Sequence, residues 1–179
     1  MARILFINMP FASFFWGSLA LGTLKAICRE GGIEADVFYL NIPFANLIGR
    51  ERYTRMSDLI DSEVCFVSEL FPEMTPESVW ERYSGLMVGQ NRESASGSLL
   101  GLKDDFLEIA GVYAPALLKD AIDSVRWDDY DVVGFTTNYY QTVASLALAR
   151  RIKDLHPDKR IVFGGSGCSG DMGKELVDV

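Results

Sequence analysis

The sequence predicts an α/β fold in which a doubly wound parallel sheet of four to five strands carries a helical insertion after its second strand. A strand–helix–strand pattern occurs near the N-terminus and again between residues 130 and 167. The residues between these two units lack this alternation and show helical spacing instead. Strands that alternate with helices pair in parallel, because each helix returns the chain to the same end of the sheet.

The clearer of the two units lies in the C-terminal third of the chain. Asp131–Phe135 is a short apolar run with a β-branched pair, typical of a strand buried on both faces. Apolar residues at helical spacing follow from 143 to 155, and Pro157 ends this helix because it forces the preceding residue out of the α conformation. Arg160–Phe163 is the second strand and ends on the pair Gly164-Gly165. Both strands therefore end at one edge of the sheet, where ligands bind in this fold class.

The N-terminal unit begins almost at the first residue. Arg3–Asn8 is its first strand, and Ser18 is a suitable N-cap for the helix that follows. Gly31-Gly32 ends this helix, because glycine accepts the left-handed conformation found just beyond helix ends. Ala35–Leu40 is the second strand. The two units together predict a Rossmann-like or flavodoxin-like sheet.

The middle of the chain, residues 42–128, is predicted to be a helical insertion between the two parts of the sheet domain, residues 1–41 and 129–179. Thr75 and Pro76 form a good helix start, with threonine as the N-cap and proline at the first helical position. One face of that helix is expected to be apolar and comprises Val79, Tyr83, Leu86 and Met87.

The rest of the insertion and the C-terminus give weaker signals. Residues 90–98 are loop-like in composition, and a helical pattern over 99–125 is expected to break near Pro115. Gly173 starts a further helix, and residues 177–179 look like the opening of a fifth strand. A sheet that stops in the middle of an element indicates a piece of a longer protein.

Composition excludes several classes of function. The net charge of −8 argues against a nucleic-acid partner, because phosphate binding depends on clustered Lys and Arg. No apolar run is long enough to cross a membrane. The three cysteines, Cys28, Cys65 and Cys168, are odd in number and match no metal spacing, which favours free thiols in a reducing cytoplasm. The single histidine, His156, is expected in a surface loop at the edge opposite the ligand edge.

Two stretches allow more than one interpretation. Phe14, Phe15 and Trp16 either contact a ligand or pack against the insertion or a partner domain. Residues 165–173 are rich in glycine and invite a phosphate-binding interpretation. They lack the Lys-Ser/Thr ending of a P-loop and follow a late strand, which argues against that interpretation.

The segments RILFINMPF and WDDYDVVGFTTNYYQTVASLALARRIKDLHPDKRIVFGG, in this order around a helical insertion, carry a resemblance to a known family. The chain resembles the N-terminal cobalamin (vitamin B12)-binding domain of radical S-adenosylmethionine enzymes. It is most similar to the group identified as maturases of ribosomally made, post-translationally modified peptides. The resemblance covers nearly the whole chain and is strongest at residues 1–41 and 127–176.

The resemblance implies a cobalamin site at the carboxyl edge of the sheet. Thr136-Thr137-Asn138 stands where cobalamin domains of the methionine synthase type carry Ser-x-Leu, and Gly164-Gly165 matches their glycine pair. Pro10 stands where their cobalt-binding histidine would be, so the implied cobalamin has its own base displaced and no histidine ligand. The cofactor-binding residues implied in this way are Asn8, Met9, Pro10, Phe11, Phe15, Trp16, Ser18, Asn41, Thr136, Thr137, Asn138, Tyr139, Tyr140, Gln141, Gly164, Gly165, Ser166 and Gly167.

The resemblance also implies what lies outside this chain. The three cysteines cannot form the Cys-x-x-x-Cys-x-x-Cys motif that binds the [4Fe–4S] cluster and S-adenosylmethionine in such enzymes. We therefore expect no catalytic residue and no metal-ligating residue here, a partner radical domain that carries the chemistry, and methyl transfer to a peptide as one outcome. An alternative is a cofactor-free scaffold domain of the same fold that recognises a peptide or a partner domain. A flavin- or nucleotide-binding module ranks lower, because no phosphate-binding loop follows the first strand.

Overall fold

The computed structural model describes residues 2–59, 61–89, 99–138 and 140–176. Its sheet has four parallel strands in the order β2-β1-β3-β4, so the predicted doubly wound α/β fold is confirmed. The strands are β1 (Arg3–Asn8), β2 (Glu34–Tyr39), β3 (Val132–Thr136) and β4 (Arg160–Gly164). Three of them differ by one residue from the predicted limits, and the expected fifth strand at 177–179 lies outside the described residues.

Helices cover the two faces of the sheet unequally. Helix α1 (Leu19–Glu30) begins at Ser18, whose Oγ accepts a hydrogen bond from the Leu21 backbone N at 3.3 Å, as predicted. It packs beside β2 and buries only Leu21, while its other large apolar residues Leu24 and Ile27 remain 44% and 58% exposed. On the opposite face, α8 (Thr142–Leu155) joins β1, β3 and the insertion in one hydrophobic core.

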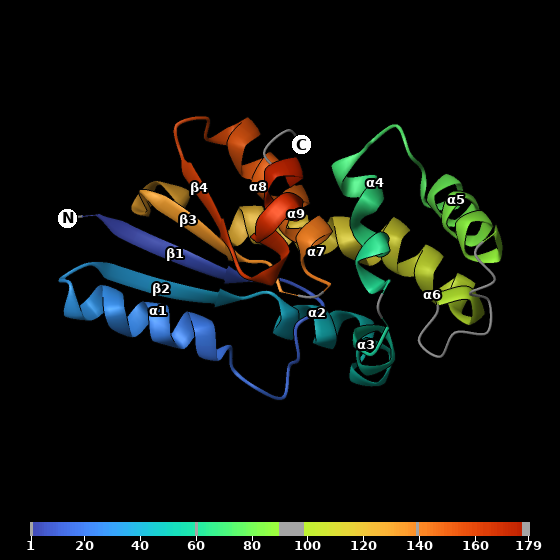
Figure 1. Cartoon of the computed structure of the whole chain (residues 1–179), viewed down its shortest axis with the longest axis horizontal. Coiled ribbons are helices and arrows are strands. Elements are labelled where there is room, and N and C mark those ends of the chain that lie inside the picture. The colour runs from blue at the N-terminus through green and yellow to red at the C-terminus, as the bar shows by residue number, and fades with distance from the viewer. Residues whose placement is uncertain (1, 60, 90–98, 139, 177–179) are drawn as a thin grey trace.

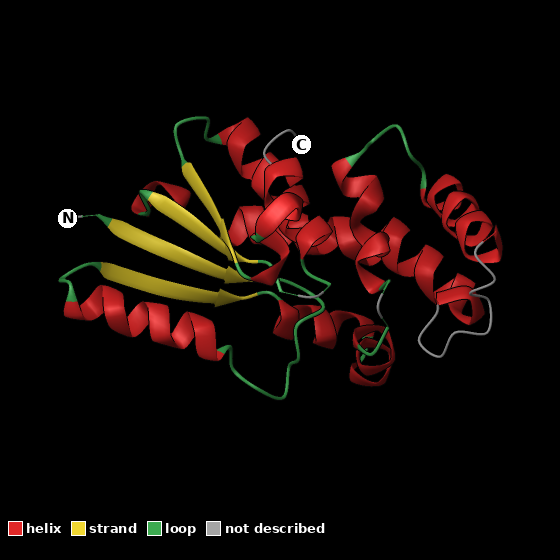
Figure 2. Cartoon of the chain, in the orientation of Figure 1, coloured by secondary structure: helices red, strands yellow, loops and turns green. Residues whose placement is uncertain are grey.

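The segment between β2 and β3 consists of helices and helical turns joined by loops, with no strand in its described part (Figure 2). In order, its elements are α2 (Asn41–Ile48), α3 (Arg50–Ser57), the 3₁₀ turn η1 (Ser62–Phe66), α4 (Val67–Leu70), α5 (Pro76–Gly89), η2 (Leu99–Leu102), α6 (Lys103–Glu108), the π-helical turn η3 (Ile109–Tyr113), α7 (Ala114–Ser124) and η4 (Trp127–Asp129). The strand arrowheads point toward this insertion, which extends beyond the carboxyl edge of the sheet (Figure 1). The chain ends with η5 (Ser166–Cys168) and α9 (Gly170–Glu175).

The structure confirms some of the features predicted for the insertion and corrects others. The Thr75 Oγ1 accepts from the Ser78 backbone N at 3.3 Å, which confirms the N-cap of α5. Leu86 is 56% exposed and does not belong to the buried face of α5, so that assignment was wrong; Val79, Tyr83 and Met87 are buried. The break predicted near Pro115 is a π-helical turn that ends just before α7 begins. Pro115 lies in the first turn of α7, where its missing N–H costs little. The loop predicted over 90–98 lies outside the described residues.

The amino edge of the sheet is held by an ion-pair network. Arg3 donates to Asp36 at 2.8 Å and lies 4.9 Å from the centre of the Tyr130 ring. Partial burial raises the pKa of Asp36, but hydrogen bonds from Arg3 and Tyr130 outweigh it and hold that pKa below its ordinary value. A hollow of about 670 Å³ lies at this amino edge. Two basic residues that line it, Arg3 and Lys25, both form ion pairs with Asp36. We therefore assign this edge to fold stability.

No helix in the described part of the chain has the length and apolar content needed to cross a membrane.

Candidate functional site

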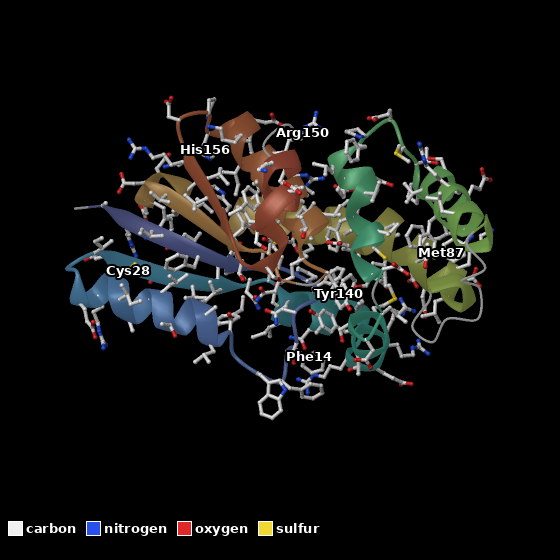
Figure 3. All side chains as sticks on the ribbon, in the orientation of Figure 1. Phe14, Cys28, Met87, Tyr140, Arg150 and His156 are labelled. Carbon is white, nitrogen blue, oxygen red and sulfur yellow. The ribbon has the colours of Figure 1, made fainter. Side chains whose placement is uncertain are left out.

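A wide, open hollow of about 470 Å³ lies at the carboxyl edge of the sheet. The end of β1, the loops that follow β1 and β3, and the first residues of α1 surround it. Seven of the residues predicted to form the site line it, namely Asn8, Phe11, Trp16, Ser18, Asn138, Tyr140 and Gln141. In Figure 3, Tyr140 lies at this end of the molecule, whereas His156 lies at the opposite end of the sheet.

A second, narrower hollow of about 170 Å³ lies between α1 and the sheet. Its wall is mostly apolar and includes Phe6, Leu24 and Val162, while the predicted site residues Thr136, Asn138, Gly164 and Gly165 also line it. Ala20 and Asn138 line both hollows, so the two adjoin. The carboxyl edge thus offers a broad opening of mixed polar and apolar lining that adjoins a narrow, mostly apolar slot.

The loops after β1 and β3 are joined by a buried amide. Gln141 is 2% exposed, and its Nε2 donates to the Asn8 Oδ1 at 3.1 Å and to the Met9 backbone O at 2.7 Å. The Phe11 backbone N donates to the Tyr140 backbone O at 3.1 Å and adds a second link. Tyr140 has a positive φ of 68°, which turns the chain sharply before α8. Tyr139 lies outside the described residues.

The loops after β3 and β4 pack backbone against backbone. The Thr137 N donates to the Gly164 O at 2.7 Å, and the Gly167 N donates to the Thr137 O at 2.8 Å. A Cβ placed on Gly165 or Gly167 would lie 2.9 or 2.8 Å from the Thr137 O. Both residues were predicted to bind the cofactor; the structure shows that the neighbouring loop requires glycine at these two positions. Gly164 differs, because an added Cβ there meets nothing within 4 Å and the residue borders the narrow hollow.

Asn138 lies at the shared mouth of the two hollows. Its Oδ1 accepts long hydrogen bonds, both 3.4 Å, from the backbone N and the Oγ of Ser166. Its side-chain nitrogen has no protein partner among the described residues and is available to a ligand oxygen. Thr136 is 6% exposed at the floor of the slot.

Several predicted site residues are buried in the core instead. Met9 is fully buried, and Phe11 is 3% exposed and packs against Phe44 and Tyr53, with ring centres 5.7 and 5.5 Å away. Thr137 is also fully buried, and Pro10 is buried beside Met9. Asn41 is 1% exposed and donates to the Ser13 backbone O at 2.9 Å. These residues shape the loops and present little side-chain surface to a ligand.

The aromatic cluster divides between the two interpretations that the sequence allowed. Phe14 packs edge-on against Tyr53 of the insertion, with ring centres 5.4 Å apart. Phe15 and Trp16 are 67% and 78% exposed, and Trp16 lines the wide hollow. Phe14 therefore packs on the insertion, whereas Phe15 and Trp16 remain exposed and Trp16 lies at the rim of the wide hollow.

Glu63 of η1 was not predicted to belong near the site. Its Oε2 accepts from the backbone N atoms of Thr142 and Val143, at 2.9 and 3.2 Å, and so caps α8 in place of an N-cap side chain. Burial raises the pKa of Glu63 above its ordinary value although these two hydrogen bonds oppose the change. The contact joins residues about 80 apart in sequence, so no local pattern could have revealed it.

Removing this cap should destabilise the domain measurably. We expect E63A to lower the free energy of unfolding by about 1–2 kcal/mol, because two helix N–H groups lose their acceptor. E63Q keeps a neutral acceptor and should cost about 0.5 kcal/mol or less at pH 7. Because the folded pKa is raised, the stability from this carboxyl group is full below its unfolded pKa and declines as pH rises through the folded pKa. Urea unfolding should therefore show a larger loss of stability from pH 5 to pH 7 in the unmodified chain than in E63Q, in which the other carboxyl groups still titrate. Equal stability of all three proteins would contradict the capping role.

The described residues contain no group of three or more His, Cys, Asp or Glu side chains arranged to hold a metal ion. Comparison with known protein families, with curated proteins and with solved structures finds no match to this chain.

Proposed function

We propose that this chain is a cobalamin-binding module that serves a radical S-adenosylmethionine enzyme, with a peptide as the substrate class. The observation that supports this most is the shape of the carboxyl edge, where a wide opening lined by both polar and apolar residues adjoins a narrow, mostly apolar slot. Cobalamin has a matching division into a broad macrocycle rimmed with amides and a slender nucleotide tail. Four of the five residues in the Thr136-Thr137-Asn138 and Gly164-Gly165 motifs line the slot, and Thr137 is buried behind them.

The chemistry of the lining residues fits such a ligand. The amide of Asn138 and the hydroxyl of Ser18 at the opening match the neutral amides of a corrin rim. The slot has room at Gly164 and apolar walls at Phe6 and Val162, which suit a flat aromatic base. The exposed ring of Trp16 would cover one face of the macrocycle.

No histidine is positioned to ligate cobalt from this chain. Pro10 is buried in the loop after β1, and His156 lies at the opposite edge of the sheet, where its Nδ1 is 3.7 Å from Asp128. We therefore propose that the cofactor is held with its own base displaced and without a histidine ligand. When bound, cobalamin would supply methyl-group transfer; the residues of this chain would hold it, orient it and shield one of its faces. A cytoplasmic location and a partner radical domain with its own [4Fe–4S] cluster and S-adenosylmethionine are part of this proposal.

One observation favours the alternative of a cofactor-free interaction domain. Phe15, Trp16 and Leu19 are 67%, 78% and 85% exposed, and adjoining apolar side chains of this kind are common where proteins dock. A flavin or nucleotide module is less well supported. The N-terminus of α8, a position where this fold class often binds phosphate, is already occupied by the Glu63 carboxylate.

The deciding experiment is a titration of the purified chain with hydroxocobalamin, followed by gel filtration and a visible spectrum of the protein fraction. We expect the corrin to stay with the protein and to show a base-off spectrum. H156A is the control and should give the same spectrum, since His156 lies far from the opening. A parallel titration with flavin mononucleotide should show no binding.

The outcomes separate the candidate functions. A histidine-ligated spectrum that disappears in H156A would contradict the proposed binding mode. A colourless protein fraction at high micromolar hydroxocobalamin, for the chain alone and together with a radical domain, would favour the interaction domain. A yellow fraction after the flavin titration would favour the flavin module.

A further inference from the structure

The loop between β1 and α1 is tied to the insertion at two consecutive carbonyl groups. The Tyr53 hydroxyl of α3 donates to the Ala12 backbone O at 2.6 Å. The Asn41 Nδ2 of α2 donates to the next carbonyl, that of Ser13, at 2.9 Å. Tyr53 is fully buried and Asn41 is 1% exposed, so both bonds are shielded from water.

The ring of Tyr53 holds the same loop from the side. It lies between Phe11 and Phe14, with ring centres 5.5 and 5.4 Å away. In this loop, Phe11 and Phe14 are therefore fixed by packing on Tyr53, whereas the next two aromatic residues, Phe15 and Trp16, project into solvent. Phe15 keeps one contact, a stacked arrangement on Phe14 with centres 4.2 Å apart.

A loop with a rigid base and an exposed aromatic tip is suited to binding. Exposed aromatic rings bury a large apolar area when they meet a ligand. A loop that is already fixed loses less conformational entropy on binding than a mobile one. The insertion supplies both the hydrogen bonds and the packing that fix it.

We infer that the helical insertion acts as a clamp that holds the loop Asn8–Ser18 in its binding shape, with Tyr53 and Asn41 as positioning residues. Neither side chain touches the ligand in this arrangement; each acts through the backbone of Ala12 or Ser13 on the placement of Trp16 at the rim of the wide hollow. The effect on affinity rests on the proposed cobalamin function, whereas the effect on the loop does not.

The test compares Y53F with Y130F. Y53F removes the hydroxyl that bonds Ala12 and keeps the ring between Phe11 and Phe14. Y130F removes a hydroxyl that bonds Asp36 at 3.1 Å at the opposite edge of the sheet, so it controls for the general loss of a hydrogen bond. Two quantities are measured for each protein, the dissociation constant of hydroxocobalamin and the fluorescence anisotropy of Trp16 without ligand. The signal of Trp16 is isolated by subtracting that of W16F, in which the buried Trp80 and Trp127 remain.

We expect Y53F to weaken hydroxocobalamin binding about fivefold, the factor that loss of one ordinary hydrogen bond gives, and to lower the anisotropy of Trp16. N41A should act in the same direction. Y130F should change neither quantity. The inference is overturned if Y53F and Y130F give the same anisotropy and the same affinity as the unmodified chain. If no protein binds the corrin but Y53F still frees Trp16, the clamp stands and the proposed function fails.

Discussion

Replacing Gly165 with alanine should lower the free energy of unfolding by about 2–4 kcal/mol, one of the largest effects expected for a single added methyl group in this chain. Gly165 has φ of 115°, a conformation that residues with a Cβ rarely adopt. The added Cβ would also lie 2.9 Å from the Thr137 O and 3.0 Å from its carbonyl carbon. Both are backbone atoms fixed by the hydrogen bonds between the two loops, so they cannot move aside cheaply.

The neighbouring glycine provides the matched control. G164A adds the same methyl group one residue earlier, where nothing lies within 4 Å, and should change stability by about 0.5 kcal/mol or less. Urea unfolding followed by circular dichroism measures both variants. If G165A were as stable as G164A, the loops after β3 and β4 would have to be more loosely packed than the distances indicate.

These two glycines show what the sequence could and could not predict. Their position after a strand at the ligand edge followed from local pattern, because strand alternation and turn residues are encoded within a few residues of one another. Their separate roles did not follow, since the close approach of Thr137 depends on a loop almost thirty residues earlier in the chain. The sequence therefore predicts where the glycine pair lies along the chain. Only the structure shows that Gly165 packs against a neighbouring loop and that Gly164 borders open space.

The same limit applies to the loop after β1. The sequence predicts that Met9 and Phe11 lie in a ligand loop, which is the ordinary expectation for residues that follow a strand. Whether such residues face a ligand or the core depends on what packs against them. Here Phe44, Tyr53 and the rest of the insertion bury them, and a helical pattern does not specify which strand end it will cover. Trp16, only five residues beyond Phe11, is left exposed by the same packing.

Contacts made by the insertion were the least predictable part of the site. The polar residues Glu63 and Asn41 and the hydroxyl of Tyr53 carry no local signature of their roles. Each acts on a backbone group that lies between 28 and 80 residues away. The insertion thus does more than cover the edge of the sheet: it caps α8 and fixes the loop before α1, the two helices that begin on either side of the wide hollow.

Filling the narrow slot should abolish ligand binding while leaving the fold intact. On the proposed function, we expect G164L to weaken hydroxocobalamin binding by at least about 100-fold, equivalent to about 2.7 kcal/mol. Gly164 lines the slot and ends β4, so a leucine side chain there would occupy space needed by the nucleotide tail. Gly164 is exposed and an added Cβ there meets no atom within 4 Å, so the backbone accepts a side chain and we expect the thermal midpoint to stay close to that of the unmodified chain.

G22L is the control for this substitution. Gly22 also has no atom within 4 Å of an added Cβ, but it borders the hollow at the amino edge of the sheet. The same glycine-to-leucine change there should leave hydroxocobalamin affinity unchanged. Equal affinity of G164L and G22L would mean that the ligand does not enter the slot between α1 and the sheet, and the site would then be limited to the wide hollow. Loss of binding in G164L alone would place the tail of the ligand beside Phe6 and Val162 and connect the glycine motif of the sequence to a single physical role, that of leaving this slot open.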